Sequence, residues 1–241
     1  MSYLQFHLVF LLPALALAAL PAIRLVREHP RLGVGTGVLV VLAYLWTTPW
    51  DNYLVATDVW DYGEGRVLAT IGYVPVEEYA FFGLQTLLAS AVTMIALDRR
   101  GLIDRAEPTA RAGRRTMLAW LVAGILAAAL TLADPTRYLG LILVWIIPPF
   151  AVQWWYGGRW LAERLRAIWP WLAGLTLYLW IADGYAIADG IWSISPAYTT
   201  GMRFGPLPLE EATFFLVTNL VVAQGLILFA SLRREALTWS R

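Results

Sequence analysis

The chain alternates between long apolar runs and short polar segments. Seven runs approach the roughly 20 residues that a helix needs to cross about 30 Å of hydrocarbon. They are Tyr3–Ile23, Leu32–Pro49, Pro75–Leu97, Thr116–Leu132, Tyr138–Tyr156, Ala167–Ala182 and Glu210–Leu232. The pattern predicts an all-α membrane protein with seven transmembrane helices. We expect the first run to be retained rather than cleaved as a signal peptide, because no basic residue precedes it and a similar run recurs later.

Composition supports a membrane protein and narrows its partners. The 241 residues are 59% hydrophobic and 15% charged, with a mean hydropathy of +0.61, which is rare in soluble domains. The lipid bilayer is therefore the expected surrounding. A net charge of +1 gives no reason to expect a nucleic-acid partner. The absence of cysteine excludes disulfides and thiolate metal sites.

Arginine supplies all the basic residues and is unevenly distributed between the apolar runs. If seven helices alternate across the bilayer, only Arg66, Arg137 and Arg203 lie on one side, and the other 15 of the 18 lie opposite. Cytoplasmic segments of membrane proteins are enriched in basic residues. We therefore expect a multi-pass protein of the cell membrane with its N-terminus outside and its C-terminus cytoplasmic.

An internal repeat organises the chain. "YLQFHLVFLLP" (Tyr3–Pro13) aligns with "YLGLILVWIIP" (Tyr138–Pro148), and "PVEEYAFF" (Pro75–Phe82) aligns with "PLEEATFF" (Pro208–Phe215). The copies are offset by 132 to 135 residues. We expect two three-helix units, 1–100 and 135–241, joined by an Arg-rich cytoplasmic loop and a linking transmembrane helix in 101–134. This 3+1+3 order makes the units parallel, related by an axis along the membrane normal.

Each copy places two glutamates at the start of an apolar run. In one isolated copy, the proline and the acidic residues would be explained by the preferences of the first helical turn. The duplication, and the cost of a carboxylate inside a membrane, favour a functional site instead. The candidate catalytic residues are Glu77, Glu78, Glu210 and Glu211.

Polar and aromatic side chains extend the helix face of the second glutamate in each copy. Gln85 follows Glu78 two turns later, and Thr218 follows Glu211 at the same spacing. Two aspartates follow apolar runs directly, where a hydrated helix end is the simpler explanation. Tryptophans nearby fit an aromatic belt or a cation-stabilising role. The candidate substrate-contacting or proton-relay residues are Asp51, Asp183, Gln85, Thr218, Phe82, Phe215, Trp60 and Trp192.

These motifs resemble a family of integral membrane carotenoid cyclases, which occur as heterodimers of two short subunits and as fused single chains. Pro75–Glu78 and Pro208–Glu211 match the family's P-x-E-[E/D] motif, and "PWDNYLV" (Pro49–Val55) is also similar. The resemblance implies a fused lycopene cyclase with lycopene as substrate and other carotenoid biosynthetic enzymes as partners. The family motif points to Glu77 and Glu210 as the stricter positions, whereas the helix faces favour Glu78 and Glu211.

Lycopene cyclisation fits paired carboxyl groups. A proton is delivered to the terminal alkene, an internal double bond attacks the cation, and a proton is lost to leave a β-ring. A buried carboxyl beside another can hold the first proton, and an ionised neighbour can accept the second. No electrons are exchanged, so we expect neither a cofactor nor a metal. Accordingly, the sequence has no G-x-G-x-x-G motif and no histidine cluster.

Two other classes of function stay open from the sequence. A proton-coupled small-molecule transporter could use parallel three-helix repeats and buried glutamates. A Mg-dependent prenyltransferase could use the aspartates of "DNYLVATDVWD" (Asp51–Asp61) to bind a diphosphate through metal ions. A retinal protein is excluded, because its Schiff base requires a lysine and the chain has none.

Overall fold

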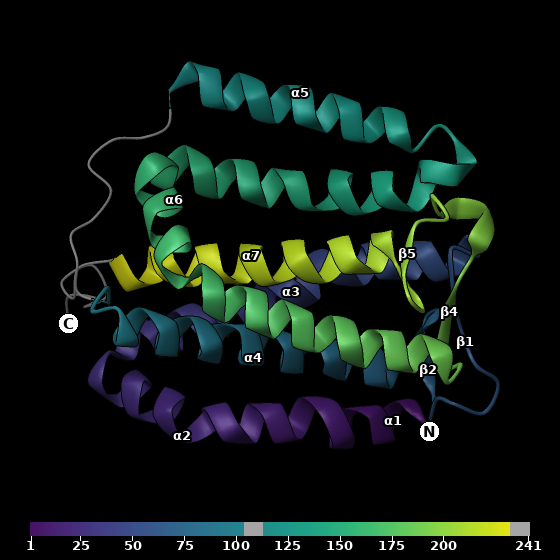
Figure 1. The fold of residues 1–241 in the computed structure, drawn as a ribbon, viewed down its shortest axis with the longest axis horizontal. Coiled ribbons are helices and arrows are strands. Elements are labelled where there is room, and N and C mark those ends of the chain that lie inside the picture. Colours follow the sequence, from purple (N-terminus) through teal and green to yellow (C-terminus); the bar gives the residue numbers. More distant parts are fainter. Residues whose placement is uncertain (104–112, 232–241) are drawn as a thin grey trace.

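The computed structural model describes residues 1–103 and 113–231 as a bundle of long helices (Figure 1). Five of the described helices are long and apolar enough to cross a membrane. These candidate spans are Tyr3–Glu28, Pro30–Ala56, Val76–Arg99, Asp134–Ala188 and Leu209–Ser231. The chain is therefore an all-α membrane protein, as the hydrophobic pattern predicts.

The first candidate span consists of α1 (Tyr3–Phe6), a π-helical turn η1 (His7–Leu11) and α2 (Leu12–Glu28). A capping box starts it: the Ser2 hydroxyl accepts the Gln5 N–H, and the Gln5 side chain accepts the Ser2 N–H. The next helices are α3 (Pro30–Ala56) and α4 (Val76–Arg99). All three agree with predicted apolar runs, although α3 extends past Pro49.

The second part of the chain contains α5 (Arg114–Leu130), the short 3₁₀ helix η2 (Asp134–Thr136), α6 (Arg137–Ala188) and α7 (Leu209–Ser231). With 17 residues, α5 is shorter than the candidate spans. The 52-residue α6 bends sharply at Gly158, where φ is 47° and ψ is −132°. Figure 1 shows its two arms running back past each other. These arms contain the predicted runs Tyr138–Tyr156 and Ala167–Ala182, which we had expected as separate helices.

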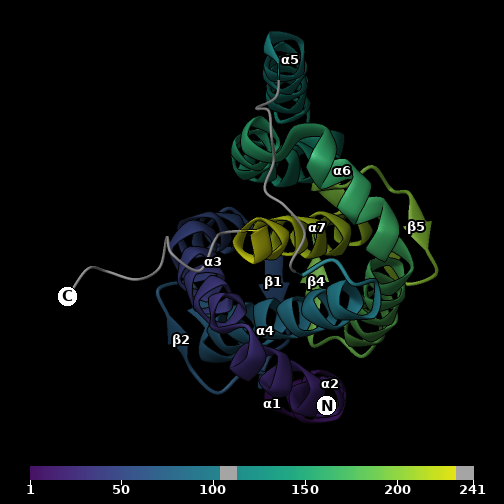
Figure 2. The same ribbon diagram turned by 90° about the vertical axis from the view of Figure 1, so that its left-hand side faces the viewer.

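The helices α4 and α7, which carry the Pro-x-Glu-Glu motifs, lie side by side in the middle of the bundle (Figure 2). Helices α2 and α3 and the two arms of α6 surround them, and α5 packs on the outside against α6. This arrangement brings the two motifs together, although they are separated by more than half the length of the chain.

Short strands, which the sequence did not predict, join the helices at one end of the bundle. Strand β1 (Trp60–Tyr62) pairs antiparallel with β4 (Trp192–Ile194). The register places Trp60 opposite Ile194, Asp61 opposite Ser193, and Tyr62 opposite Trp192. With the repeat offset of 132, Trp60 corresponds to Trp192 and Tyr62 to Ile194. The ladder therefore pairs the two copies as a twofold axis would.

Two small hairpins lead into the central helices. Strands β2 (Thr70–Ile71) and β3 (Val74–Pro75) precede α4, while the 3₁₀ helix η3 (Pro196–Tyr198) and strands β5 (Arg203–Phe204) and β6 (Leu207–Pro208) precede α7. Gly72 and Gly205 occupy the hairpin turns with φ of 66° and 63°, a region that favours glycine. The hairpins fix the start of each motif-bearing helix.

The bend of α6 depends on glycine at position 158. A side chain is strained at its positive φ, so Gly158→Ala should reduce the free energy of unfolding by about 1–3 kcal/mol. Gly37→Ala is the matched control, because a Cβ there meets no atom within 4 Å. Thermal unfolding in detergent should show a clear loss for Gly158→Ala and none for Gly37→Ala. Equal melting temperatures for the two variants would contradict a requirement for glycine at the bend.

Candidate functional site

Four carboxyl side chains gather at the end of the bundle that carries the strands. They come from four helical segments: Asp51 from α3, Glu78 from α4, Asp183 from the second arm of α6 and Glu211 from α7. Each is only 1% exposed. Asp51 and Asp183 each lie within electrostatic range of both glutamates. We call Asp51, Glu78, Asp183 and Glu211 the carboxyl cluster.

The two aspartates lie inside their helices, which corrects the expectation that they follow helix ends. Asp51 and Asp183 each stand five residues before the last helical residue. Pro49 does not end α3, because a membrane helix tolerates the loss of one backbone N–H. The helix also gains from continuing, since Leu54 is fully buried. Burial of both aspartates follows from these extended helices.

Two tyrosines that the sequence did not assign to the site are bound to the glutamates. The Tyr3 hydroxyl donates to Glu78 Oε2 at 2.5 Å, and the Tyr138 hydroxyl donates to Glu211 Oε1 at 2.5 Å. Tyr3 and Tyr138 occupy equivalent places in the repeat. Their alignment was the signal available in the sequence, but it carried no information about their partners.

A third tyrosine breaks the symmetry. The Tyr62 hydroxyl donates to Glu78 Oε2 at 3.2 Å, whereas the equivalent position in the second copy is Ile194. Tyr62 lies in β1, outside the candidate spans. Burial, with the nearby Glu78 carboxyl, raises the pKa of Tyr62 well above its usual value. The phenol therefore remains protonated and keeps donating to Glu78.

The first glutamate of each motif has a different environment from the second. Glu77 Oε1 accepts the Leu68 N–H at 2.9 Å, and Glu210 Oε1 accepts the Thr200 N–H at 2.7 Å. The two bonds are equivalent in the repeat, because Leu68 and Thr200 are 132 residues apart and the two glutamates are 133 apart. Both glutamates are buried, and their Oε2 atoms have no hydrogen-bond partner among the described residues. The first glutamates thus hold the loops that precede α4 and α7, while the second glutamates belong to the carboxyl cluster.

The two equivalent tryptophans of the repeat, Trp192 and Trp60, differ in their hydrogen bonds. Trp192 Nε1 donates to Asp183 Oδ1 at 2.9 Å. Trp60 Nε1 and both Asp51 carboxylate oxygens are buried, and within residues 1–103 and 113–231 they have no partner. The Trp60 ring instead stacks against Tyr62, with centroids 6.1 Å apart. Equivalent residues of the repeat therefore have different hydrogen bonds.

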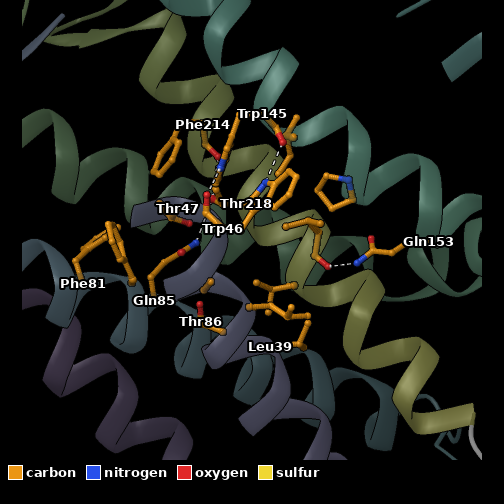
Figure 3. Close-up of a pocket in the computed structure, with 17 residues that line it drawn as sticks. Leu39, Trp46, Thr47, Phe81, Gln85, Thr86, Trp145, Gln153, Phe214 and Thr218 are labelled. Carbon is orange, nitrogen blue, oxygen red and sulfur yellow. Dashed lines mark hydrogen bonds between the residues drawn. The ribbon is translucent and has the colours of Figure 1, made fainter. Parts of the chain in front are cut away.

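A cavity of about 120 Å³ lies between α3, α4, the first arm of α6 and α7 (Figure 3). Its aromatic lining residues are Trp46, Phe81, Phe82, Trp145 and Phe214, and its polar lining includes Thr47, Thr86, Gln85, Gln153 and Thr218. Gln85 Nε2 donates to Thr218 Oγ1 at 3.1 Å and to Asn219 Oδ1 at 3.0 Å. Phe215 does not line the cavity but packs edge-on against Phe81, which does. The sequence-predicted residues Phe82, Gln85 and Thr218 therefore line one cavity.

The cavity begins one helical turn from three members of the carboxyl cluster. Thr47 precedes Asp51 by one turn, Phe82 follows Glu78 by one turn, and Phe214 follows Glu211 by three residues. No group of three or more His, Cys, Asp or Glu side chains arranged to hold a metal ion is found in the described part of the chain. Buried acids beside an aromatic cavity are suited to proton transfer to and from an apolar substrate.

The tyrosine hydroxyls should stabilise the fold through the glutamates. Tyr3→Phe or Tyr138→Phe leaves a buried carboxyl without its donor, which should cost about 1–3 kcal/mol of unfolding free energy. The control Tyr53→Phe removes a hydroxyl from a side chain that is 51% exposed. Thermal unfolding in detergent should separate the first two variants from the third. If all three variants melt together, the two short hydrogen bonds contribute nothing to stability.

Comparisons with known proteins identify a family. A family model described as lycopene cyclase matches residues 135–226, which begin where the second repeat unit is predicted to begin. A lycopene beta-cyclase of Halobacterium salinarum is 44% identical, with 95% of this chain and 96% of that protein covered. No solved structure matches the chain.

Fungal relatives are longer. A bifunctional lycopene cyclase/phytoene synthase of Neurospora crassa is 35% identical over 95% of this chain, which covers 39% of that protein. The corresponding protein of Sporisorium reilianum is 32% identical, with 95% of this chain and 35% of that protein covered. Identity at this level across nearly the whole sequence, in archaeal and fungal proteins alike, shows that the chain belongs to the lycopene cyclase family.

Proposed function

We propose that this protein is a lycopene β-cyclase that closes β-rings on its substrate inside the membrane. The carboxyl cluster above an aromatic cavity carries the proposal, because it supplies proton donors and acceptors next to a site for an apolar end group. The H. salinarum relative, named lycopene beta-cyclase and similar over the whole chain, supports the same substrate and ring type. The carotenoid would reach the site from the bilayer in which it dissolves.

The reaction uses two carboxyl groups in opposite protonation states. One carboxylic acid of the carboxyl cluster adds its proton to the terminal alkene of the linear end group. The resulting tertiary cation is attacked by an internal double bond, which forms the ring bond. An ionised carboxylate then removes a proton from the ring and leaves a ring alkene. Four close carboxyls out of water favour such a mixture, because like charges cannot all be ionised together.

The cavity wall is suited to the cationic intermediate. Trp46, Trp145 and Phe214 contribute aromatic rings to it, and the stacked Trp145 and Phe214 rings have centroids 6.0 Å apart. Aromatic faces attract cations, more strongly where water is excluded. Excluding water also prevents its addition to the cation. The reaction exchanges no electrons, and we propose that it needs no flavin, nicotinamide or metal.

We also propose the seven-span, 3+1+3 arrangement. The five candidate spans become six when the arms of α6 are counted separately, and seven when α5 is added. Helices α2, α3 and α4 then form one unit, and the arms of α6 with α7 form the other. The pairing of β1 with β4, symmetric under the repeat offset, supports a twofold axis along the membrane normal.

The proposed orientation places the strands and the carboxyl cluster on the outer side. The ends of α2 and α4 and the bend of α6 lie at the opposite end of the bundle (Figure 1). Basic residues occupy the last turns there, such as Arg27 in α2 and Arg99 in α4. The positive-inside rule then makes that end cytoplasmic.

Expression in lycopene-accumulating cells tests the proposed function. We expect the wild-type protein to convert lycopene to pigments with β-rings, detected by chromatography. At least one of Glu78→Gln and Glu211→Gln should reduce ring formation by at least about 100-fold, the scale of general acid–base catalysis. Glu163→Gln is the control, because Glu163 pairs with Arg159 on the surface of α6.

Three results would contradict the proposal in different ways. Persistent lycopene with abundant folded protein would exclude the cyclase. Uptake of a solute by proteoliposomes without any pigment change would favour a transporter. Ring formation at the wild-type rate in both Glu→Gln variants would retain the cyclase but remove the role of the second glutamates.

A further inference from the structure

The two halves of the carboxyl cluster are related by the repeat but are not chemically equivalent. In one half, Asp183 accepts a hydrogen bond from Trp192. In the other half, neither Asp51 oxygen has a donor among the described residues, although Asp51 is 1% exposed and Trp60, the counterpart of Trp192, is also buried. A buried carboxyl without donors is costly when ionised. The neutral acid is the form of Asp51 that this environment favours.

The neighbouring glutamate has the opposite environment. Glu78 Oε2 accepts hydrogen bonds from both Tyr3 and Tyr62. Its counterpart Glu211 accepts one such bond, from Tyr138. Hydrogen bonds from phenols favour the ionised form of a carboxylate. The extra donor at Tyr62 therefore makes ionisation easier for Glu78 than for Asp51, which belongs to the same half.

The cavity also favours this half. Thr47, which lies one turn before Asp51 on the same face of α3, lines the 120 Å³ cavity. On the other side of the bundle, a groove between α2, α4 and the second arm of α6 extends along α6 only to Tyr178, more than one turn from Asp183. Leu179, one turn before Asp183, is fully buried. The cavity therefore approaches Asp51 through Thr47, whereas none of its lining residues lies within one turn of Asp183.

On the basis of the proposed function, we propose that Asp51 is the proton donor, Glu78 is the proton acceptor, and only this half of the cluster closes rings. The O–H bond of Asp51 breaks as a C–H bond forms at the terminal alkene. The new ring bond forms, and a ring C–H bond then breaks to give its proton to Glu78. Return of that proton from Glu78 to Asp51, which lies within electrostatic range, restores the site without net proton uptake.

A single competent half closes one ring at each visit of the substrate. The one-ring product must leave the cavity and present its other end before a second ring can form. At excess lycopene, the one-ring compound should therefore accumulate free of the protein before the two-ring product appears.

Matched aspartate variants test the assignment in purified, lipid-reconstituted protein supplied with lycopene. Asp51→Asn should reduce the rate of ring formation at least about 100-fold, whereas Asp183→Asn should lose less than about tenfold. Asp51→Glu restores a carboxyl and should recover part of the activity lost in Asp51→Asn. If Asp51→Glu recovers activity and Asp51→Asn unfolds at the wild-type temperature, the activity lost in Asp51→Asn comes from the missing carboxyl and not from misfolding.

The outcomes distinguish this assignment from the proposed function. If wild-type protein forms rings but Asp51→Asn is fully active, or Asp183→Asn is equally inactive while folded, the assignment is wrong and the cyclase stands. The claim that only one half closes rings would be wrong if two-ring product forms at excess lycopene without any free one-ring compound. If wild-type protein forms no ring at all, the cyclase itself fails.

Discussion

Burying six carboxyl groups in one apolar bundle is the constraint on which the strand-bearing end of this structure depends. A buried carboxyl needs donors, or it must remain neutral. Tyr3 and Tyr138 supply hydroxyl donors to the second glutamates. The loop N–H groups of Leu68 and Thr200 supply donors to the first glutamates. The start of α1, the start of α6 and the loops that precede α4 and α7 are therefore each held in place by an acidic side chain.

The repeat explains how one chain can assemble such a site. Each copy contributes a tyrosine, an aspartate and a glutamate pair, and the central packing of α4 against α7 brings the copies together. Symmetry places the acids, but symmetry alone would make the two halves identical. The halves differ in two ways. The second copy has Ile194 where the first has Tyr62, and Trp192 bonds to an aspartate whereas Trp60 does not. The duplicated scaffold thus allows related carboxyls to differ in protonation.

Much of the fold could be predicted from the sequence, because membrane spans are determined by local hydrophobicity. The helix-face argument also predicted that Glu78 and Glu211 point inward, since it depends only on spacing. The extension of α3 past Pro49 could not be predicted in this way, because tertiary burial of Leu54 decides it. The partners of the glutamates are 75 and 73 residues away, so no local pattern reveals them. The strands β1 and β4 are similarly determined by pairing between distant copies.

Asp51 has no hydrogen-bond donor in the described part of the chain, and this has a chemical consequence as well as an energetic cost. Each unsatisfied buried polar group costs about 1–3 kcal/mol, so a fold selected only for stability would supply donors there. The proton donor to an alkene must carry its proton in the resting site, and hydrogen-bond donors to its oxygens would favour ionisation instead. Water cannot replace those donors either, since it would add to a carbocation. A buried carboxyl that has no donor among the described residues and lies one turn from an aromatic-lined cavity meets the first requirement, and the hydrogen-bonded Glu78 and Glu211 lie within electrostatic range of it.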